Sequence, residues 1–172
     1  MKLLWIDLNS SYAHASLALP ALHAQMMQYA DAEWDVVSAT ANEPPGPVVD
    51  EIVRRRPDLL AATAWLFTHE ALLHLLARVR AMLPQCIVVL GGPEFLGDNE
   101  SYLRRTPWVD AVFRGEGEEV FPQWLPLWKQ RERWADVPGL CYIDPETGAY
   151  RDNGTARVVR FDCLIPPEQS PF

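Results

Sequence analysis

Four short segments hold the residues whose types and spacing could do chemistry, at 9–14, 65–68, 91–94 and 114–118. Each of them follows an apolar run, and two are rich in glycine, with the sequences GGPE and RGEGE. Glycine lets the backbone approach a ligand closely and offers N–H groups that no side chain covers. These segments therefore suit the binding of a ligand, although each glycine pair alone could simply make a tight turn.

The same segments lack the residues of several familiar catalytic and phosphate-binding sites. A phosphoacceptor receiver domain needs an Asp at the end of its third strand, where this sequence has Ala64-Trp65-Leu66-Phe67. No G-x-G-x-x-G follows the first apolar run, no P-loop Lys is present, and no nucleophile motif comes with a positioned base. The neutral, aromatic and small residues favour a bulky, flat, largely uncharged ligand over acid–base catalysis.

The histidines form no recognisable metal-binding pattern. His14 stands just before a predicted helix, where a histidine often only bonds to neighbouring backbone, and His23 is two or more helical turns further on. His69 and His74 are five residues apart, so they do not share one helix face. The sequence therefore predicts no histidine metal site.

The aromatic and acidic residues of the four segments also have ordinary structural roles. Trp65 and Phe67 stand at a strand end, where such residues usually belong to the core or its rim. Glu94, Glu116 and Glu118 could each cap a helix N-terminus, where a carboxylate meets free N–H groups and the positive end of the helix dipole. Capping is the simpler interpretation of each glutamate than catalysis.

Alternating strands and helices must position these segments. Apolar runs predict strands at 2–8, 34–40, 58–65, 86–90 and 108–113. Amphipathic patterns predict helices at 16–30 (with Ser16 as N-cap), 48–55, 69–83, 98–105 and 118–130, the last one disturbed by prolines. The alternation predicts an α/β fold, namely a flavodoxin-like or Rossmann-like five-stranded parallel sheet in the order 2-1-3-4-5 with helices on both faces. Ligands bind at the carboxyl ends of such strands, so all four segments should share one edge.

The pattern changes after residue 135. Residues 139–143 and 156–161, joined by a turn at 144–148, predict a small C-terminal β-hairpin appendage. The proline-rich end at 164–172 predicts an extended linker. We therefore expect an α/β domain at 1–135, a hairpin at 136–163 and a linker that leads to a further, C-terminal domain of a larger protein.

Composition restricts the partners and the location. The net charge of −8 argues against nucleic acid and anionic membranes, both of which would repel the chain. The three cysteines are far apart and form no C-x-x-C pair, which disfavours a zinc site and a disulfide framework. No signal peptide and no run of about 18 apolar residues is evident. We expect a cytoplasmic protein with no membrane partner.

Three motifs in order, LNSSYAHASLAL, GGPE and RGEGEEVF, resemble the N-terminal cobalamin (vitamin B12)-binding domain of cobalamin-dependent radical S-adenosylmethionine proteins. The resemblance extends over the hairpin VPGLCYIDPETG and the exit LIPPEQSPF. It implies a corrinoid on the carboxyl edge of the sheet. The cofactor-binding residues it implies are Asn9, Ser10, Tyr12, His14, Ser16, Leu17, Trp65, Leu66, Phe67, Gly91, Gly92, Pro93, Glu94, Arg114, Gly115, Glu116, Gly117 and Glu118.

The first loop departs from one known pattern of cobalamin binding. Families in which a protein histidine is the lower ligand of cobalt have D-x-H-x-x-G there, whereas this sequence has Asn9 in place of the His and Tyr12 in place of the Gly. Radical methylases with this domain bind cobalamin without a histidine ligand, and the resemblance implies the same for this chain. The lower face of cobalt would then be vacant, water-bound or covered by a side chain such as Tyr12 or Trp65. His14 becomes a loop-organising or corrinoid-edge residue.

The chain contains no C-x-x-x-C-x-x-C motif for a [4Fe–4S] cluster. The resemblance therefore implies a domain that is non-catalytic alone, in a parent that also uses a [4Fe–4S] cluster and S-adenosylmethionine and that includes methyltransferases among its relatives. Its partner would be the radical S-adenosylmethionine domain of the same chain. Two alternatives stay open, a flavodoxin-like module that binds flavin or a nucleotide, and a degenerate docking domain without a ligand.

Overall fold

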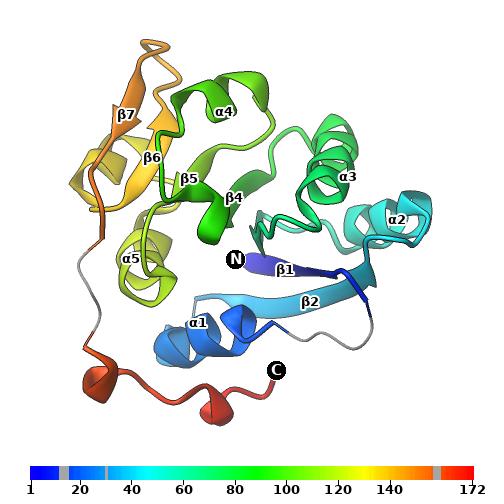
Figure 1. Cartoon of the computed structure of the whole chain (residues 1–172), viewed down its shortest axis with the longest axis horizontal. Helices are drawn as coiled ribbons and strands as arrows, with labels where there is room; N and C mark the ends of the chain where they lie inside the picture. The colour runs from blue at the N-terminus through cyan, green and yellow to red at the C-terminus, as the bar shows by residue number, and fades with distance from the viewer. Residues whose placement is uncertain (12–15, 30, 157–159) are drawn as a thin grey trace.

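The structure is a computed structural model of the whole chain, and it describes all residues except 12–15, 30 and 157–159. One seven-stranded sheet has the order β2-β1-β3-β4-β5-β6-β7 (Figure 1). The strands are β1 (Lys2–Asn9), β2 (Glu33–Thr40), β3 (Leu59–Thr63), β4 (Ile87–Gly91), β5 (Ala111–Phe113), β6 (Leu140–Ile143) and β7 (Tyr150–Asp152). The helices are α1 (Ala18–Met26), α2 (Pro45–Arg55), α3 (His69–Met82), α4 (Glu100–Arg105) and α5 (Gly117–Trp124). The first five strands are parallel, which confirms the predicted α/β fold and the order 2-1-3-4-5.

Side chains that alternate along β1 show how the sheet is buried on both faces. Leu3 and Trp5 pack with α1 and α5, whereas Leu4 and Ile6 pack with α2, α3 and α4. Figure 1 shows these two groups of helices on opposite sides of the sheet. Burial on both faces explains why the central strands are continuous apolar runs, as is typical of parallel sheets.

Several helices begin or end elsewhere than predicted. Helix α1 begins at Ala18 with Leu17, and not the predicted Ser16, as its N-cap residue, although the Ser16 hydroxyl accepts the Ala18 N–H at 3.2 Å. The helix ends at Met26 because the Tyr29 N–H closes a tight turn onto the Met26 carbonyl. Helix α2 begins at Pro45, earlier than predicted, because a proline at the first helical position loses no hydrogen bond. Helix α5 gives way at residue 125 to a short 3-10 helix, η2 (Leu125–Leu127), which contains a proline.

The predicted position of the second hairpin strand, at 156–161, is wrong. Strand β6 pairs with Tyr150–Asp152 and not with 156–161, of which residues 157–159 lie outside the described part. The reason is a tight turn in which the Asp144 carboxylate accepts the N–H groups of Glu146 and Thr147, while Gly148 has a φ of 68°. This turn reverses the chain early, so the return strand begins at once. The hairpin also continues the sheet, because β6 pairs antiparallel with β5.

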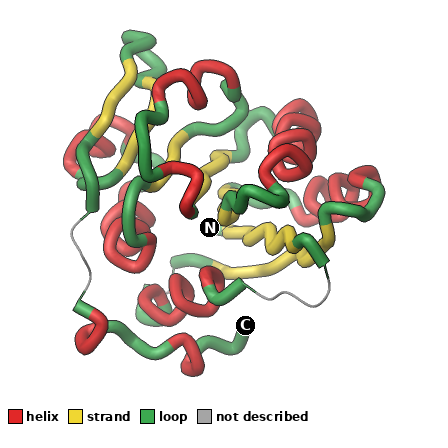
Figure 2. Tube along the Cα trace, viewed as in Figure 1, coloured by secondary structure: helices red, strands yellow, loops and turns green. Residues whose placement is uncertain are grey.

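The C-terminal segment 164–172 lies along α1 (Figure 2). The Gln25 side chain donates to the Ile165 carbonyl at 2.8 Å and accepts the Ile165 N–H at 3.1 Å. The Ser170 hydroxyl is 3.0 Å from Nδ1 of His23. The expectation that this segment leads to another domain, and the domain boundaries, stay predictions. Within the described residues, no helix is long and apolar enough to cross a membrane.

A buried carboxylate holds the amino end of β5 in place. The Asp110 side chain is 6% exposed, pairs with Arg80 and Arg131, and accepts the Val88 N–H at 2.8 Å. Asp110→Ala would leave two cations and a backbone donor without their partner, so we expect the free energy of unfolding to fall by about 3 kcal/mol. Urea denaturation followed by tryptophan fluorescence measures the change. The control Glu100→Ala removes an exposed pair with Arg104 and should cost below about 0.5 kcal/mol; an equal loss in both variants would contradict the prediction.

Candidate functional site

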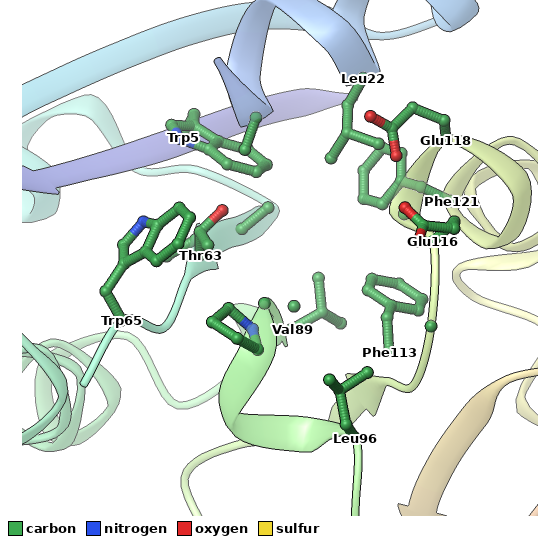
Figure 3. A pocket seen from close by; sticks show the side chains of 18 residues that line it. Trp5, Leu22, Thr63, Trp65, Val89, Leu96, Phe113, Glu116, Glu118 and Phe121 are labelled. Carbon is green, nitrogen blue, oxygen red and sulfur yellow. The ribbon is translucent and has the colours of Figure 1, made fainter. Parts of the chain in front are cut away.

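The candidate site lies at the carboxyl edge of the parallel strands, where β1, β3, β4 and β5 end side by side. Two cavities open there, and we call them the inner cavity and the crest cavity. The inner cavity has a volume of about 320 Å³ and lies between the sheet and helices α1 and α5 (Figure 3). The predicted residues that line it are Trp65, Gly91, Gly92, Pro93, Gly115, Glu116, Gly117 and Glu118.

The remaining walls of the inner cavity are mostly apolar, and three of the residues that form them are aromatic. Trp5 on β1, Phe113 on β5, Leu22 of α1 and Phe121 of α5 all line it, and the Phe113 and Phe121 rings lie on the same side with their centroids 5.6 Å apart (Figure 3). All of these side chains are at least nine-tenths buried. The sequence indicated them only as core residues, since an apolar residue on a strand looks the same whether it meets a neighbour or a cavity. Their position next to the ligand edge is evident only in the fold.

Glycine is required at one of these positions and allows close packing at a second. Gly92 has a φ of 113°, and a Cβ there would lie 2.7 Å from the Ala64 carbonyl oxygen. A Cβ on Gly117 would lie 3.2 Å from the Leu22 side chain, so this glycine permits the close approach of α5 to α1. Both glycines therefore shape the cavity walls in addition to making turns.

The only charged side chains on the inner cavity, among the described residues, are two carboxylates. Glu116 is the N-cap residue of α5 and Glu118 belongs to its first turn. Figure 3 shows both beside Leu22 and Phe121. Both lie at the N-terminus of the helix, where the helix dipole favours a carboxylate, but the Glu116 side chain forms no capping hydrogen bond, so the predicted cap is wrong there. Their oxygens are hydrogen-bond acceptors for a ligand in the cavity.

The crest cavity, of about 490 Å³, lies over the end of β1. Its predicted residues are Asn9, Ser10, Ser16, Trp65 and Phe67. Trp65 lines both cavities and is 41% exposed, and Phe67 is 81% exposed. Two exposed rings beside a cavity offer apolar, aromatic surface to a ligand.

Asn9 is held by the carboxylate two residues before it. Its Nδ2 donates to Oδ2 of Asp7 at 2.9 Å. Burial raises the pKa of the Asp7 carboxyl, and the hydrogen bond from Asn9 acts in the opposite direction. The pair therefore directs the Asn9 amide nitrogen toward Asp7, at the position where a histidine would stand in D-x-H-x-x-G.

Four other predicted site residues line neither of the two cavities. Leu66 and Glu94 line a separate groove toward α3, where Glu94 pairs with Nδ1 of His69 at 3.5 Å. Arg114 forms an ion pair with Asp152 on β7. Leu17 is 71% exposed and lines neither cavity. Tyr12 and His14 lie outside the described residues. The part of the chain that the structure describes contains no group of three or more side chains suited to a metal ion.

Residues 8–125, which begin at the end of β1 and include β2 to β5 and every loop of the edge, match the protein family described as "B12 binding domain". The chain belongs to the B12-binding domain family. The predicted family is thereby confirmed, together with its relation to cobalamin-dependent radical SAM enzymes.

Known sequences relate this B12-binding domain to parts of much larger proteins. It is 30% identical over 105 residues to the anaerobic magnesium-protoporphyrin IX monomethyl ester cyclase of Rubrivivax gelatinosus, which covers 58% of this chain and 18% of that protein. It is 27% identical over 130 residues to the cobalamin-dependent radical SAM methyltransferase TokK of Streptomyces tokunonensis, which covers 71% of this chain and 19% of TokK. The chain thus spans less than a fifth of the length of these relatives.

Solved structures show the same fold. The cobalamin-dependent S-adenosylmethionine radical enzyme OxsB, with aqua-cobalamin and S-adenosylmethionine bound, aligns with 96% of this B12-binding domain at a TM-score of 0.77 and 15% identity, over 23% of its own chain. The radical S-adenosylmethionine methyltransferase TsrM from Kitasatospora setae, with cobalamin and a [4Fe-4S] cluster bound, aligns with 96% of it at a TM-score of 0.71 and 19% identity, over 31% of its own chain.

Proposed function

We propose that this B12-binding domain binds cobalamin at the carboxyl edge of its sheet, with the corrin ring over the crest cavity and the aromatic base of the nucleotide tail in the inner cavity. The observation that carries the proposal is Trp65, which forms a common wall of two cavities at the edge where the family match lies. A flat ligand with a smaller aromatic arm needs such a pair of adjoining spaces.

The chemistry of the residues fits cobalamin. A corrin ring is flat and carries neutral carboxamides on its rim, and the exposed rings of Trp65 and Phe67 match such a surface. The Gly92 backbone, which no side chain covers, can donate to carboxamide oxygens, while Glu116 and Glu118 can accept from carboxamide nitrogens. The apolar inner cavity suits an aromatic base.

We further propose that no protein imidazole from the first loop binds cobalt. Asn9 stands at the histidine position of D-x-H-x-x-G and its amide nitrogen is committed to Asp7. An amide is a poor ligand for cobalt compared with an imidazole. Trp65 is the described side chain best placed to cover the lower face, because it lines both cavities and remains exposed. Cobalamin supplies a cobalt centre whose redox behaviour depends on that axial ligand.

For the larger protein we propose a radical S-adenosylmethionine enzyme in which a following domain carries the [4Fe–4S] cluster and S-adenosylmethionine. The relation to TokK, whose name describes a cobalamin-dependent radical SAM methyltransferase, supports methyl transfer as the reaction. A cytoplasmic location is consistent with Cys86 and Cys141, which are buried thiols without a disulfide.

A titration separates these readings from a flavin or nucleotide module and from a domain without a ligand. Purified protein is mixed with hydroxocobalamin, freed of unbound cofactor and examined by visible absorption. We expect a retained corrinoid with a shifted spectrum. A copurifying yellow flavin would favour the flavodoxin-like alternative, and the absence of any retained corrinoid would contradict the proposal.

Trp65→Ala tests the shared wall of the two cavities. We expect the dissociation constant for hydroxocobalamin to rise about tenfold to a hundredfold, because a partly exposed aromatic anchor is lost from the centre of the site. Trp65→Phe should recover most of that affinity. The control Met82→Ala changes an exposed side chain at the far end of α3 and should bind as the wild type does. Equal affinity of Trp65→Ala and the wild type would argue against this role.

A further inference from the structure

We propose that the β6–β7 hairpin holds in place the two glycine-containing loops of the proposed cofactor edge, 93–99 and 114–118. Arg114 and Asp152 are the positioning pair. The inference rests on the proposed function and assigns a role to a hairpin outside the matched residues 8–125. We call the four residues Arg114, Asp152, Asn99 and Tyr150 the hairpin bracket.

Asp152 stands at the same edge of the sheet as the cavities. Strand β5 pairs antiparallel with β6, and β6 pairs antiparallel with β7, so β7 runs in the direction of β5. Asp152 is the last residue of β7 and therefore lies at the carboxyl edge. The turn at 144–148, which shortens the hairpin, is what places an acidic residue at this point.

The Asp152 carboxylate is fully engaged. Its Oδ2 accepts from Nη1 of Arg114 at 2.8 Å, and its Oδ1 accepts the Gly154 N–H at 2.9 Å. The Cys141 thiol lies 3.7 Å from Oδ1. The Arg114 and Asp152 side chains are 24% and 33% exposed, so the ion pair is partly shielded from solvent but is not part of the hydrophobic core.

Arg114 connects both loops of the inner cavity to the hairpin. Its Nε donates to the Leu96 carbonyl at 3.2 Å, and Leu96 lines the inner cavity. Its own N–H donates to the Gly139 carbonyl at 2.7 Å, and its carbonyl accepts the Ala156 N–H at 3.2 Å. Arg114 therefore begins the loop 114–118 and contacts the loop that follows β4, and it lines neither cavity. We assign it a positioning role for the two loops.

The loop that follows β4 has a second attachment to the hairpin. Asn99 is 2% exposed, and its side-chain amide donates to the carbonyls of Phe95 and Gly97 at 3.0 and 3.2 Å. The Asn99 N–H donates to the Tyr150 hydroxyl on β7 at 3.4 Å. The loop 93–99 is thus tied to the hairpin directly at Asn99 and, through Arg114, at Leu96.

These contacts imply that the bracket reduces the motion of the two loops before the ligand arrives. A preformed site loses less conformational entropy on binding than a mobile one, which raises affinity without any added ligand contact. Loss of Asp152 should therefore loosen 93–99 and 114–118 and weaken binding, while the rest of the sheet keeps its stability.

The experiment uses Asp152→Asn, Arg114→Lys and the control Arg151→Gln, which changes the neighbouring residue and an ion pair to Asp144 at the other end of the hairpin. Amide hydrogen exchange is measured in the ligand-free proteins, and hydroxocobalamin affinity by absorption titration. In Asp152→Asn we expect exchange in 93–99 and 114–118 to accelerate at least about threefold and affinity to fall about five- to tenfold. Arg114→Lys keeps the charge but loses the Nε contact to Leu96, so it should give an intermediate loss, and the control none.

Unchanged exchange in both loops of Asp152→Asn would overturn the bracket, and so would faster exchange with unchanged affinity. If the wild-type domain bound no cobalamin, the proposed function would fail by itself. The exchange measured in ligand-free protein would still support or overturn the ordering of the loops by the bracket.

Discussion

Replacing Ala18 with tryptophan is expected to weaken cobalamin binding at least about a hundredfold while the domain stays folded. Ala18 is the first residue of α1 and lines the inner cavity. An indole at this position would occupy the space of about 320 Å³ that we assign to the aromatic base of the tail. Because the cavity is apolar and Ala18 is only half-buried, the stability of the domain should change by no more than about 1 kcal/mol.

The matched control for this prediction is Ala81→Trp, an exposed alanine of α3 on the other side of the sheet. It introduces the same side chain into a helix, away from both cavities, and should leave the dissociation constant unchanged. Isothermal titration with hydroxocobalamin measures affinity, and urea denaturation measures stability. Wild-type affinity in Ala18→Trp would show that the inner cavity is not used.

Gly92→Ala is expected to lower the free energy of unfolding by about 3 kcal/mol and to impair cobalamin binding with it. Gly92 combines a φ of 113° with a ψ of 179°, a backbone conformation that is essentially restricted to glycine. A Cβ there would meet the Ala64 carbonyl oxygen at 2.7 Å and the Thr63 side chain at 2.8 Å, both at the end of β3. Relief of this contact must move the loop that lines the inner cavity.

Gly97→Ala is the control for Gly92→Ala, since it lies in the same loop with open space around its Cβ and without a positive φ. We expect its stability to change by less than about 0.5 kcal/mol. Chemical denaturation followed by tryptophan fluorescence compares the two variants. Similar stability of both variants would contradict the assigned backbone strain.

Local sequence patterns predicted the strand order and the shared edge of the four loops correctly because both follow from alternation and from the parallel direction of the strands. The same patterns did not predict that Trp5 and Phe121 line a cavity. Their apolar character predicted burial, but only the closure of α1 and α5 over the sheet turns them into cavity walls.

Ion pairs between residues that lie far apart in the chain could not be predicted from the sequence either. Arg114 belongs to a glycine-rich loop and was therefore predicted to contact the cofactor, a role that nothing in the structure tests. Its partner Asp152 is 38 residues further along the chain, on a strand that the sequence pattern placed at 156–161. The predicted hairpin turn was right, but its sharpness depends on the Asp144 carboxylate and on Gly148, whose combined effect on strand position is not visible in an apolar pattern.

The first loop was interpreted from a family resemblance and not from a local pattern. The resemblance to cobalamin-binding domains drew attention to Asn9, and the hydrogen bond to Asp7 explains how that amide is oriented. Nothing in the sequence alone indicated that Trp65 would line two cavities. In the proposed complex, Trp65 would therefore cover cobalt in place of a residue at the histidine position.

Electron paramagnetic resonance of bound cob(II)alamin tests the central proposal most directly. The reduced cofactor is added to excess protein, unbound corrinoid is removed, and the spectrum of the cobalt(II) centre is recorded. A nitrogen ligand on the axial position splits the cobalt lines through its nuclear spin. We predict a retained corrinoid whose lines show no such splitting, because the tail base occupies the inner cavity and Asn9 replaces the histidine. Contradiction would come from a protein that retains no corrinoid, or from nitrogen splitting, assigned to a protein ligand if it disappears in His14→Ala and to the tail base if it persists.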